Sequence, residues 1–450
     1  MDIAACVIAA AAESEEKTIV DNVETGSGTA TPKFFAVDFF CGAGGTTRGL
    51  IEAGGYVLAG IDKVPDCAAT YEANNVNRTL DGMPARYLQR DVFDKTDDYP
   101  DGDMRDLIVE LNDLIQPRLD SHRNIPLLFS ICAPCQPFTR LTQIQMTEKR
   151  ETGRTRDRGL LGQSLEYIKT FYPEMIICEN VAGIQKAMYG GVWQQFAAEL
   201  EELGYIVGSA IVNASKFGIP QNRRRSIMLA VHRRAALDDA FGEWDATSIA
   251  VPMEDPEAPA MTVRDAIGSL PPIEAGTKHP DIPNHQSAKL SEINRRRLEA
   301  VQPGGSNLAF IGTDLELACH RKMREKEASG EVPNYTAGFS DVYCRMDPDK
   351  PSPAITTKFF ATSCGRFGHY EQTRAISIRE AAALQSFPND YKFLGGSIQQ
   401  NAKMVGNAVP PKLSTFFAGW LIQRAQAYEL NEDRNLKRER EKEDMERAAA

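Results

Sequence analysis

Asp38-Phe-Phe-Cys-Gly-Ala-Gly-Gly45 is a glycine-rich turn that follows a strand-like run at residues 34–38 and opens a helical pattern at residues 46–53. Glycines in such a turn let the backbone bend tightly and approach a ligand, and the amino end of the helix favours a carboxylate or a phosphate. Glycine-rich turns are also common as purely structural features. The strand, turn and helix together nevertheless predict the first unit of an α/β fold.

Further strand-like runs continue the series after this turn, and most are separated by helical patterns. The runs lie at residues 56–61, 86–90, 127–131, 175–178, 205–212 and 227–231. The helical patterns include residues 65–75, 160–171 and 192–203. Strands separated by helices of this length predict parallel crossover units and a doubly wound sheet. Ligands of such sheets bind at the carboxyl ends of the strands, so the residues just after each strand are the first candidates for a site.

Changes in composition divide the chain into five predicted segments. Residues 1–33 are expected to form a mobile lead-in and residues 34–234 the main α/β domain. Residues 235–375 are rich in proline, glycine and isolated charges, which predicts a smaller, loop-rich domain inserted into the first. Residues 376–428 are expected to complete the first domain, and residues 429–450 to form a charged tail.

The charge of the chain is unevenly distributed. The 450 residues carry a formal net charge of −11, which argues weakly against nucleic acid as a partner. Net charge is a poor guide to the local field, however. Residues 216–234 carry six lysines and arginines and no acid, so a basic cleft on an acidic body is physically reasonable.

The cellular setting is indicated by the cysteines and by the amino-terminal stretch. Nine scattered cysteines suit the reduced thiols of a cytosolic enzyme better than a disulfide framework. The apolar stretch at residues 3–12 is too short to span a bilayer, and no lysine or arginine precedes it as in a secretory signal. These features predict a cytoplasmic protein that does not associate with a membrane.

Acidic residues follow the second and third predicted strands. Asp62 ends the second strand and Asp91 follows the third. An acid after the second strand suits the hydroxyls of a ribose, and an acid after the third could accept a hydrogen bond from an adenine amino group. With the glycine turn, these acids indicate a cofactor that contains adenosine. They do not distinguish NAD from S-adenosylmethionine (AdoMet).

Ser130-Ile-Cys-Ala-Pro-Cys-Gln-Pro-Phe-Thr139 follows the fourth strand. Pro134 and Pro137 stiffen the turn that presents Cys135, which would be a strong nucleophile as a thiolate. Cys132 and Cys135 also form a Cys-X-X-Cys pair, so a thioredoxin-like redox pair or two incidental cysteines remain open readings. A structural zinc site needs a second such pair, which the sequence lacks, and we therefore expect no metal.

Charged residues follow the fifth strand and precede the last one. Glu179 emerges from Met175-Ile-Ile-Cys-Glu-Asn-Val181 and is a candidate general acid, although it could instead anchor a loop through backbone hydrogen bonds. In Gln221-Asn-Arg-Arg-Arg225, the alternation of an extended chain places Arg223 and Arg225 on one side. These two guanidiniums could converge on a base edge, a phosphate or a carboxylate, or the segment could be a solvated basic strand.

Taken in order, these motifs resemble those of the DNA cytosine-5 methyltransferase family. The matching motifs are Asp38-Phe-Phe-Cys-Gly-Ala-Gly-Gly45, Ala133-Pro-Cys-Gln-Pro-Phe138, Glu179-Asn-Val181, Gln221-Asn-Arg-Arg-Arg225, Arg379-Glu-Ala-Ala-Ala-Leu-Gln-Ser-Phe-Pro388 and Gly406-Asn-Ala-Val-Pro410. The resemblance spans residues 34–425 except the variable region. It implies a Rossmann-like, AdoMet-dependent methyltransferase sheet with residues 235–375 as the target-recognition domain.

The resemblance implies a cofactor site for AdoMet. Its expected residues are Phe40, Gly42, Gly44, Gly45, Asp62, Asp91, Pro134 and Asn407. Asp62 stands where the family usually has glutamate, which keeps the chemistry but shifts the contact. Asn407 requires the last helix, near residues 412–428, to pack back on the first strands. Arg379 and Glu380 are expected to be structural, in agreement with the helix capping box that Ser377-Ile-Arg-Glu380 fits.

The resemblance also implies a catalytic mechanism. Cys135 would add to C6 of a cytosine that has been flipped out of the duplex, and Glu179 would protonate N3. Arg225, with Arg223, would orient the base near its O2. The polar residues 139–158 would form a loop that closes over the base. In the target-recognition domain, Arg295–Arg297, Lys358, Arg366 and His369 are candidates for DNA contacts.

The expected partner is double-stranded DNA, and the expected protein is a monomeric bacterial or phage modification enzyme with a companion restriction endonuclease. Three other functions remain open. A tRNA cytosine-5 methyltransferase would share the architecture, but such enzymes usually show Cys-Phe-Thr where this chain has Ala-Gly-Ile after Val181. A thiol-disulfide oxidoreductase would use Cys132 and Cys135 together. A DNA-binding protein without activity would not need Cys135, Glu179 and Arg225.

Overall fold

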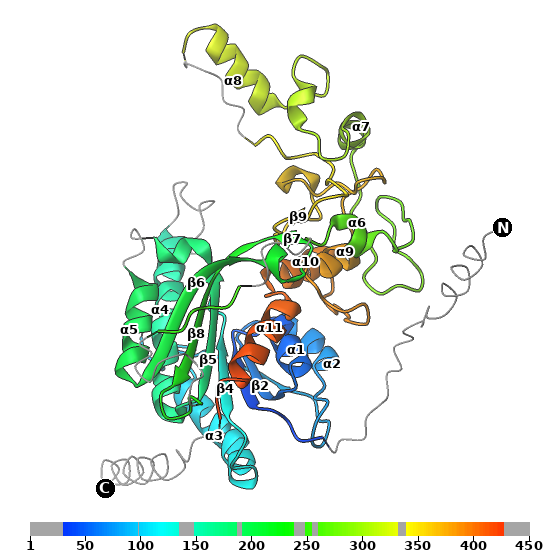
Figure 1. Cartoon of the computed structure of the whole chain (residues 1–450). Coiled ribbons are helices and arrows are strands. Elements are labelled where there is room, and N and C mark those ends of the chain that lie inside the picture. Colours follow the sequence, from blue (N-terminus) through cyan, green and yellow to red (C-terminus); the bar gives the residue numbers. More distant parts are fainter. Residues whose placement is uncertain are drawn as a thin grey trace, which may run out of the picture.

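A seven-stranded β-sheet lies at the centre of the fold (Figure 1). The computed structural model describes residues 30–97, 99–134, 148–186, 191–237, 248–253, 260–331 and 339–426, with the backbone alone for residues 148–158. The strands are β1 (Phe35–Phe39), β2 (Tyr56–Asp62), β3 (Arg86–Gln89), β4 (Leu127–Ile131), β5 (Met175–Val181), β6 (Tyr205–Asn213) and β8 (Arg224–His232). Their order across the sheet is β3-β2-β1-β4-β5-β8-β6.

All seven predicted strands are present, but the last one runs in the opposite direction to its neighbours. β3, β2, β1, β4 and β5 are parallel, whereas β8 is antiparallel to both β5 and β6. Only a short 3-10 turn, Ala214–Phe217, and the two-residue strand β7 (Gln221–Asn222) lie between β6 and β8. Because a parallel connection needs a crossover of a dozen or more residues, this link permits only an antiparallel return.

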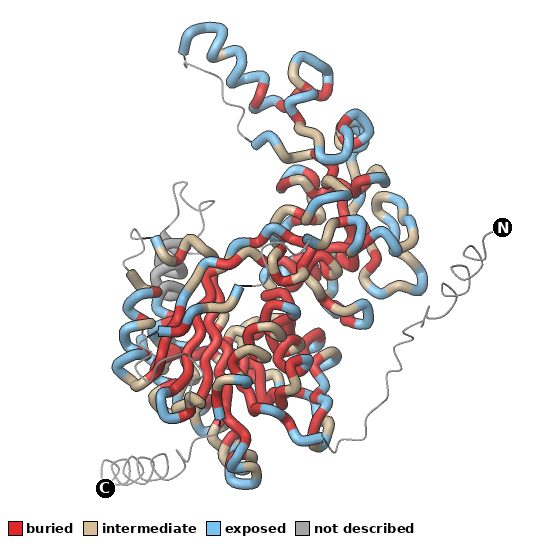
Figure 2. The backbone as a smooth tube through the Cα atoms, in the orientation of Figure 1, coloured by how far each residue is buried: buried red, intermediate tan, exposed pale blue. Residues whose placement is uncertain are grey.

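Helices cover both faces of the sheet, as a doubly wound fold requires. One face packs against α3 (Met104–Ser121), α4 (Glu148–Phe171) and α5 (Val192–Glu202). The other packs against α1 (Gly45–Glu52), α2 (Ala68–Asn74) and α11 (Pro411–Ile422). Figure 2 shows the sheet strands as an almost continuous buried layer between these helices. The sheet is therefore the main hydrophobic core.

Two helical segments differ from the sequence prediction. α3 was not predicted, although its buried leucines and isoleucine recur at every fourth residue from Leu107 to Leu119, as expected for one helical face. Its acidic outer face and Pro117 hide this pattern in the sequence. The expected loop at residues 139–158 is wrong from residue 148 onward, because α4 begins at Glu148. Residues 139–147 lie outside the described residues, as do 1–29 and 427–450.

The segment that leads into α11 packs closely on α1, where two glycines leave room for it. A methyl group on Gly45 would lie 2.4 Å from the carbonyl oxygen of Val409, and one on Gly49 would lie 2.3 Å from that of Pro411. The Thr415 hydroxyl donates a hydrogen bond to the carbonyl of Gly49 at 3.0 Å. α11 therefore packs directly on α1, which confirms that the last helix returns to the first strands.

A smaller, loop-rich unit lies beyond one end of the sheet (Figure 1). Its elements are α6 (Val263–Ile267), α7 (Glu292–Ala300), α8 (Ala318–Ala328), β9 (Ser352–Pro353), α9 (Ile378–Leu384) and α10 (Ile398–Asn407). An apolar cluster joins α6, α9 and α10, and it also includes Ala43 of the glycine turn. Ala235 and Ile249, in contrast, pack with the sheet. The domain boundaries at residues 234 and 375 remain a prediction.

Buried arginines connect the loops of this unit through backbone carbonyls. Arg345 and Arg379 each donate to three of them: Arg345 to Leu298, His369 and Gln372, and Arg379 to Pro283, Pro388 and Tyr391. Arg379 is 1% exposed and Arg345 is 6% exposed. These contacts agree with the structural role expected for Arg379.

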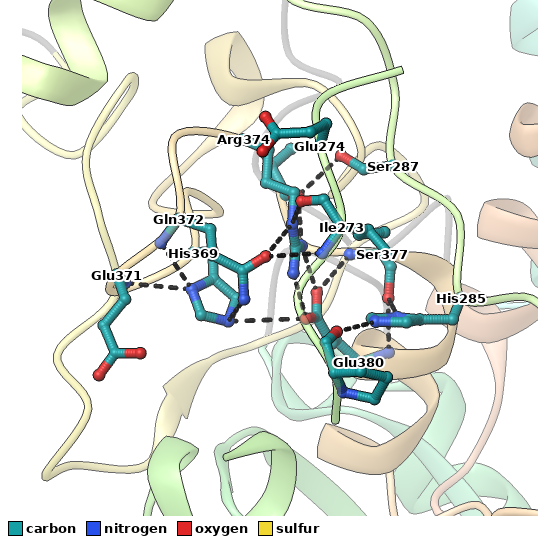
Figure 3. A network of polar contacts seen from close by, with 12 residues as sticks. Ile273, Glu274, His285, Ser287, His369, Glu371, Gln372, Arg374, Ser377 and Glu380 are labelled. Atoms are coloured by element: carbon teal, nitrogen blue, oxygen red, sulfur yellow. Dashed lines mark hydrogen bonds and ion pairs between the residues drawn. The ribbon is translucent and has the colours of Figure 1, made fainter. Parts of the chain in front are cut away.

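A buried ion pair between Arg374 and Glu380 forms the centre of a polar network (Figure 3). The guanidinium donates to both carboxylate oxygens, at 2.7 and 2.6 Å. Glu380 also accepts from the backbone N–H of Ser377 at 2.6 Å, and the Ser377 hydroxyl accepts from the N–H of Glu380. This reciprocal pair is the predicted capping box, which the structure confirms at the start of α9.

Two histidines complete the network. His369 accepts hydrogen bonds at Nδ1 from the backbone N–H groups of Glu371 and Gln372, both at 3.1 Å, and its Nε2 lies 3.6 Å from Glu380. His285 lies 2.9 Å from the Ser377 hydroxyl. Burial lowers the pKa of His369 to about 4, although the charge of Glu380 acts in the opposite direction. The folded protein therefore holds His369 in its neutral form at physiological pH.

The glycine surface of α1 gives a test by substitution. We expect Gly49→Ala to lower the free energy of unfolding by about 1–3 kcal/mol because the methyl group overpacks the contact with Pro411. Gly419→Ala in α11 is the matched control, since none of the described atoms lies within 4 Å of its added methyl group. That control should keep the stability or raise it by up to about 1 kcal/mol. Urea unfolding of both variants measures the difference, and a stabilised Gly49→Ala would contradict this packing.

The buried state of His369 predicts acid sensitivity. Its pKa is lower in the folded chain than the usual value of about 6.5, so the unfolded chain binds more protons between these two values. Stability is thus full above about pH 6.5 and is lost toward pH 4, with about 2 kcal/mol gone at pH 5.

We expect His369→Asn, which retains an acceptor, to flatten the fall in unfolding free energy between pH 7 and pH 5. His279→Asn is the control for the substitution, because His279 Nδ1 accepts two backbone N–H bonds in a similar turn. Parallel curves for wild type and His369→Asn in chemical unfolding across this range would refute the assignment.

Candidate active site

Five parallel strands end side by side, and the candidate residues follow these ends. In sheet order they are Asp91 after β3, Asp62 at the end of β2, the glycine turn after β1, Pro134 after β4 and Glu179 near the end of β5. The register pairs Asp62 with Gln89 and Ile131 with Cys178, so these ends lie at one level. The structure therefore brings the expected cofactor residues and the expected catalytic strand ends to one edge of the sheet.

The glycine turn and Asp62 form an open cradle. Phe40, Gly42 and Gly44 have φ values of 61°, 51° and 88°, in the left-handed region that strongly favours glycine. The N–H of Gly42 donates to Asp62 Oδ2 at 2.9 Å, and the N–H of Val64 donates to Oδ1 at 2.9 Å. None of the described atoms lies within 4 Å of the point where a methyl group on Gly42 would stand. The turn therefore leaves space beside an oriented carboxylate.

Burial affects the chemistry of this cradle. It raises the pKa of the Asp62 carboxyl, whereas the hydrogen bonds from the N–H groups of Val64 and Gly42 act in the opposite direction. Phe40, which is not a glycine, accepts the strained left-handed conformation next to the turn. Strain of this kind costs about 1–3 kcal/mol and is concentrated at functional sites.

The carboxyl-terminal part of the chain supplies a further wall of the cradle. Tyr391 donates from its hydroxyl to the carbonyl of Ala43 and accepts from Asn75. The Cβ atom of Ala408 would lie 3.3 Å from a methyl group on Gly45. Asn407, the last residue of α10, is exposed. Asn75 and Tyr391 were not predicted, and no sequence pattern connects residues that lie 316 positions apart.

Asp91 and Pro134 lie on either side of the cradle. Asp91 is 8% exposed and its carboxylate accepts from the N–H of Phe93 at 3.3 Å. Pro134 is the last described residue before Cys135, which itself lies outside the described residues. Asn180 donates from its side chain to the carbonyl of Ala133 at 3.1 Å. This bond ties the segment that leads to Cys135 directly to the residue after Glu179.

Glu179 is paired with Arg225 at the end of β5. Arg225 Nε lies 2.5 Å from Glu179 Oε1, and the two side chains are 12% and 11% exposed. β5 and β8 set this geometry, because their register pairs Val181 with Arg225 and Glu179 with Ile227. The carboxylate is thus held by a guanidinium rather than only by the backbone of a loop. The pair places one acid and one fixed cation next to the segment that leads to Cys135.

Arg223 does not share this contact. It is 4% exposed and donates to the backbone carbonyls of Ile355, Gly406 and Ala408, at 2.9, 3.2 and 3.3 Å. The two arginines do not converge on one group, since Arg225 contacts Glu179. The expectation that both would meet the same ligand therefore does not agree with the structure.

Cys132, just after β4, is half-buried, and Cys178 in β5 is buried. Burial raises the pKa of Cys132, whose Sγ lies 3.7 Å from the hydroxyls of both Thr46 and Ser130. Cys178 is fully buried in β5, and burial raises its pKa as well. Because thiol-disulfide exchange requires a thiolate, Cys132 is poorly suited to a redox pair with Cys135.

The candidate DNA contacts of the smaller unit have protein partners in most cases. Arg295 pairs with Glu292 and Glu299, and Arg296 pairs with Asp314. Other contacts are Arg297 to the carbonyl of Leu315, Arg366 to that of Gly305, and His369 in the buried network. Of these, His369 is 2% exposed and lies inside the fold, which excludes it as a surface contact.

Among the residues that the structure describes, no group of three or more histidine, cysteine, aspartate or glutamate side chains is arranged to hold a metal ion. Over the same residues, no helix combines the length and the apolar composition that a membrane span needs.

Comparison with known proteins identifies the family. Residues 34–423 match the C-5 cytosine-specific DNA methylase family. Type II methylase M.HgiDII of Herpetosiphon aurantiacus is 36% identical over 385 residues, which cover 85% of this chain and 93% of that relative. Type II methyltransferase M1.HphI of Haemophilus parahaemolyticus is 30% identical over 382 residues, with 85% of each chain covered. The chain belongs to the C-5 cytosine-specific DNA methylase family and is an enzyme of this kind.

A solved structure supports the fold. A prophage-encoded methyltransferase of E. coli superimposes with a TM-score of 0.50 at 20% identity, over 87% of this chain and 99% of that one. At this identity the likeness bears on the fold alone. The predicted family, the predicted enzyme class and the Rossmann-like methyltransferase fold are confirmed.

The Glu179–Arg225 pair predicts a coupled loss of stability. We expect Arg225→Met to lower the free energy of unfolding by about 3 kcal/mol, because it leaves the Glu179 charge buried without its partner. Adding Glu179→Gln removes that charge, so the double variant should lose at least about 1 kcal/mol less than the sum of the single losses. A double-mutant cycle by urea unfolding measures this coupling. Strictly additive losses would show that the two side chains do not stabilise each other.

Proposed function

We propose that this enzyme transfers a methyl group from AdoMet to C5 of a cytosine flipped out of double-stranded DNA, through a covalent bond between Cys135 and C6. The observation that carries the proposal is the Glu179–Arg225 pair, fixed beside the segment that leads to Cys135. The family match supports the reaction, and the Type II relatives support a role in restriction–modification.

The open cradle fits AdoMet. Gly42 leaves space where any side chain would intrude, and Asp62 presents an oriented carboxylate for ribose hydroxyls. We assign Asp91 to the adenine amino group, and Phe40, Gly44, Gly45, Pro134 and Asn407 to the remaining walls. When bound, AdoMet supplies an electrophilic methyl group on its sulfonium sulfur.

The protein supplies the activation of the base. C5 of cytosine is too weak a nucleophile alone, so the Cys135 thiolate forms a bond to C6 and the electron pair moves toward C5. Glu179 donates a proton to N3, which disperses the charge that develops in the ring. Arg225 orients Glu179 and donates toward O2. After methyl transfer, N3 returns its proton to the Glu179 carboxylate. The C5 proton then leaves to a base, the C6–S bond breaks and the Cys135 thiolate is released.

The DNA must deform for this reaction. Flipping the base costs a few kcal/mol, which contacts elsewhere on the duplex must offset. The basic residues 216–234 and residues 235–375, as the target-recognition domain, are assigned to these contacts. We further propose that the enzyme acts as a cytoplasmic monomer in a bacterial or phage system, with a separate endonuclease for the same sequence.

Bisulfite sequencing of DNA from cells that express the chain tests the reaction and its target together. A fixed sequence context with protected cytosines is expected. Methylation of tRNA with unmodified DNA would instead favour the RNA-directed alternative, against which Ala182-Gly-Ile184 argues at the position of the usual Cys-Phe-Thr.

Cys132 and Cys135 provide a matched pair of variants. Cys135→Ala should lower methyl transfer by a factor of at least about 10⁴, because it removes the nucleophile. Cys132→Ala removes the other member of the Cys-X-X-Cys pair and should retain most of the activity. Transfer of tritiated methyl groups to DNA, with binding of S-adenosylhomocysteine as a control for folding, measures both. Equal losses in the two variants would contradict Cys135 as the single nucleophile, and full activity of Cys135→Ala would exclude the mechanism.

A further inference from the structure

We infer that Arg223 is a positioning residue that fixes Asn407 of the cofactor cradle relative to Arg225 and Glu179. This inference deepens the proposed function and rests on it. It replaces the expected role of Arg223 at the base with an indirect role, exerted through the backbone of α10.

The guanidinium of Arg223 donates hydrogen bonds to the backbone on both sides of Asn407. One of its terminal nitrogens, Nη2, donates to the carbonyls of Gly406 and Ala408, and the other, Nη1, donates to that of Ile355. The last carbonyls of a helix have no partner within the helix, so the end of α10 depends on such donors. Arg223 is 4% exposed, and water therefore competes little for these bonds.

Two other parts of the protein, Gln385 and the segment after β9, also contact the end of α10. Gln385 donates to the carbonyls of Val405 at 2.7 Å and Ala408 at 3.4 Å. A methyl group on Gly406 would lie 2.5 Å from the backbone nitrogen of Thr357, so α10 presses directly on the segment after β9. The position of Asn407 is thus set by the groups around the end of α10, and Arg223 is the charged member of this set.

Arg223 is also connected to the Glu179–Arg225 pair, because it lies directly before β8 and only two residues from Arg225. Arg225 lies in β8, where it pairs with Val181 of β5 and Val212 of β6. The carbonyl of Arg223 accepts from the N–H of Ala214 at 2.9 Å, which fixes the backbone between the two arginines. Two residues of extended chain span only about 6.6–6.8 Å. The backbone around Asn407 is therefore connected to the Glu179–Arg225 pair through the Arg223 side chain and the short segment from Arg223 to Arg225.

Arginine is required for this link because of its shape. A guanidinium carries five N–H donors in a planar fork, so it can serve three carbonyls at once. A lysine ammonium is a compact charge that cannot span the same three acceptors. Arg223→Lys therefore keeps the charge and loosens the end of α10.

The experiment compares Arg223→Lys with Arg345→Lys. Arg345 is also buried and also serves three carbonyls, but its partners include neither α10 nor β8. Isothermal titration with S-adenosylhomocysteine, at a temperature where each variant is folded, measures the cofactor site without turnover. We expect Arg223→Lys to bind about tenfold more weakly and to lower kcat by up to about 100-fold. Arg345→Lys should lose thermal stability with less than a twofold change in affinity.

The outcomes separate the inference from the proposed function. Equal affinities of the two lysine variants for S-adenosylhomocysteine would overturn the positioning role. No binding by the wild-type chain would overturn the proposed function itself. If Arg223→Lys does not fold, Gln385→Met removes the other donor to the Ala408 carbonyl at nearly constant volume. That variant should bind about threefold more weakly, and unchanged affinity would again overturn the inference.

Discussion

The smaller unit of the enzyme depends on buried guanidinium groups that satisfy backbone carbonyls. The helices described in it are short and its strand pairing is limited, so many of its carbonyls lack the partners that regular structure provides. A buried carbonyl left without a donor costs about 1–3 kcal/mol. Arg223, Arg345 and Arg379 each satisfy three such groups. A few arginine side chains thus supply hydrogen bonds that backbone groups supply in regular secondary structure.

In the proposed mechanism, the sheet separates the residues assigned to the cofactor from those assigned to the base, and keeps both sets at one edge. β3, β2 and β1 end in the acids and glycines of the cradle, and β4 and β5 end in the residues assigned to the cytosine. The antiparallel β8 adds Arg225 from the opposite direction, which no parallel strand could do at that point. The reversal of β8 is therefore part of the site.

Short-range patterns explain which features could be predicted. Strands, the glycine turn, Asp62 and the capping box at Ser377 depend on residues within a few positions, and the sequence displays them directly. α3 was missed because its apolar stripe is narrow among acidic residues. The role of Arg223 depends on carbonyls 132 to 185 positions away, and an arginine has the same letter at a ligand and at a backbone clamp. Cys135 is supported by family likeness and not by described geometry.

The packing of α11 on the glycines of α1 has a consequence for biosynthesis. α1 is the first helix that the structure describes and α11 is the last. The strands around α1 must therefore wait for some 360 further residues before their outer face is covered. Such long-range closure slows folding and leaves apolar surface open during translation. A chain of this design is expected to need protection by chaperones until its final segment emerges.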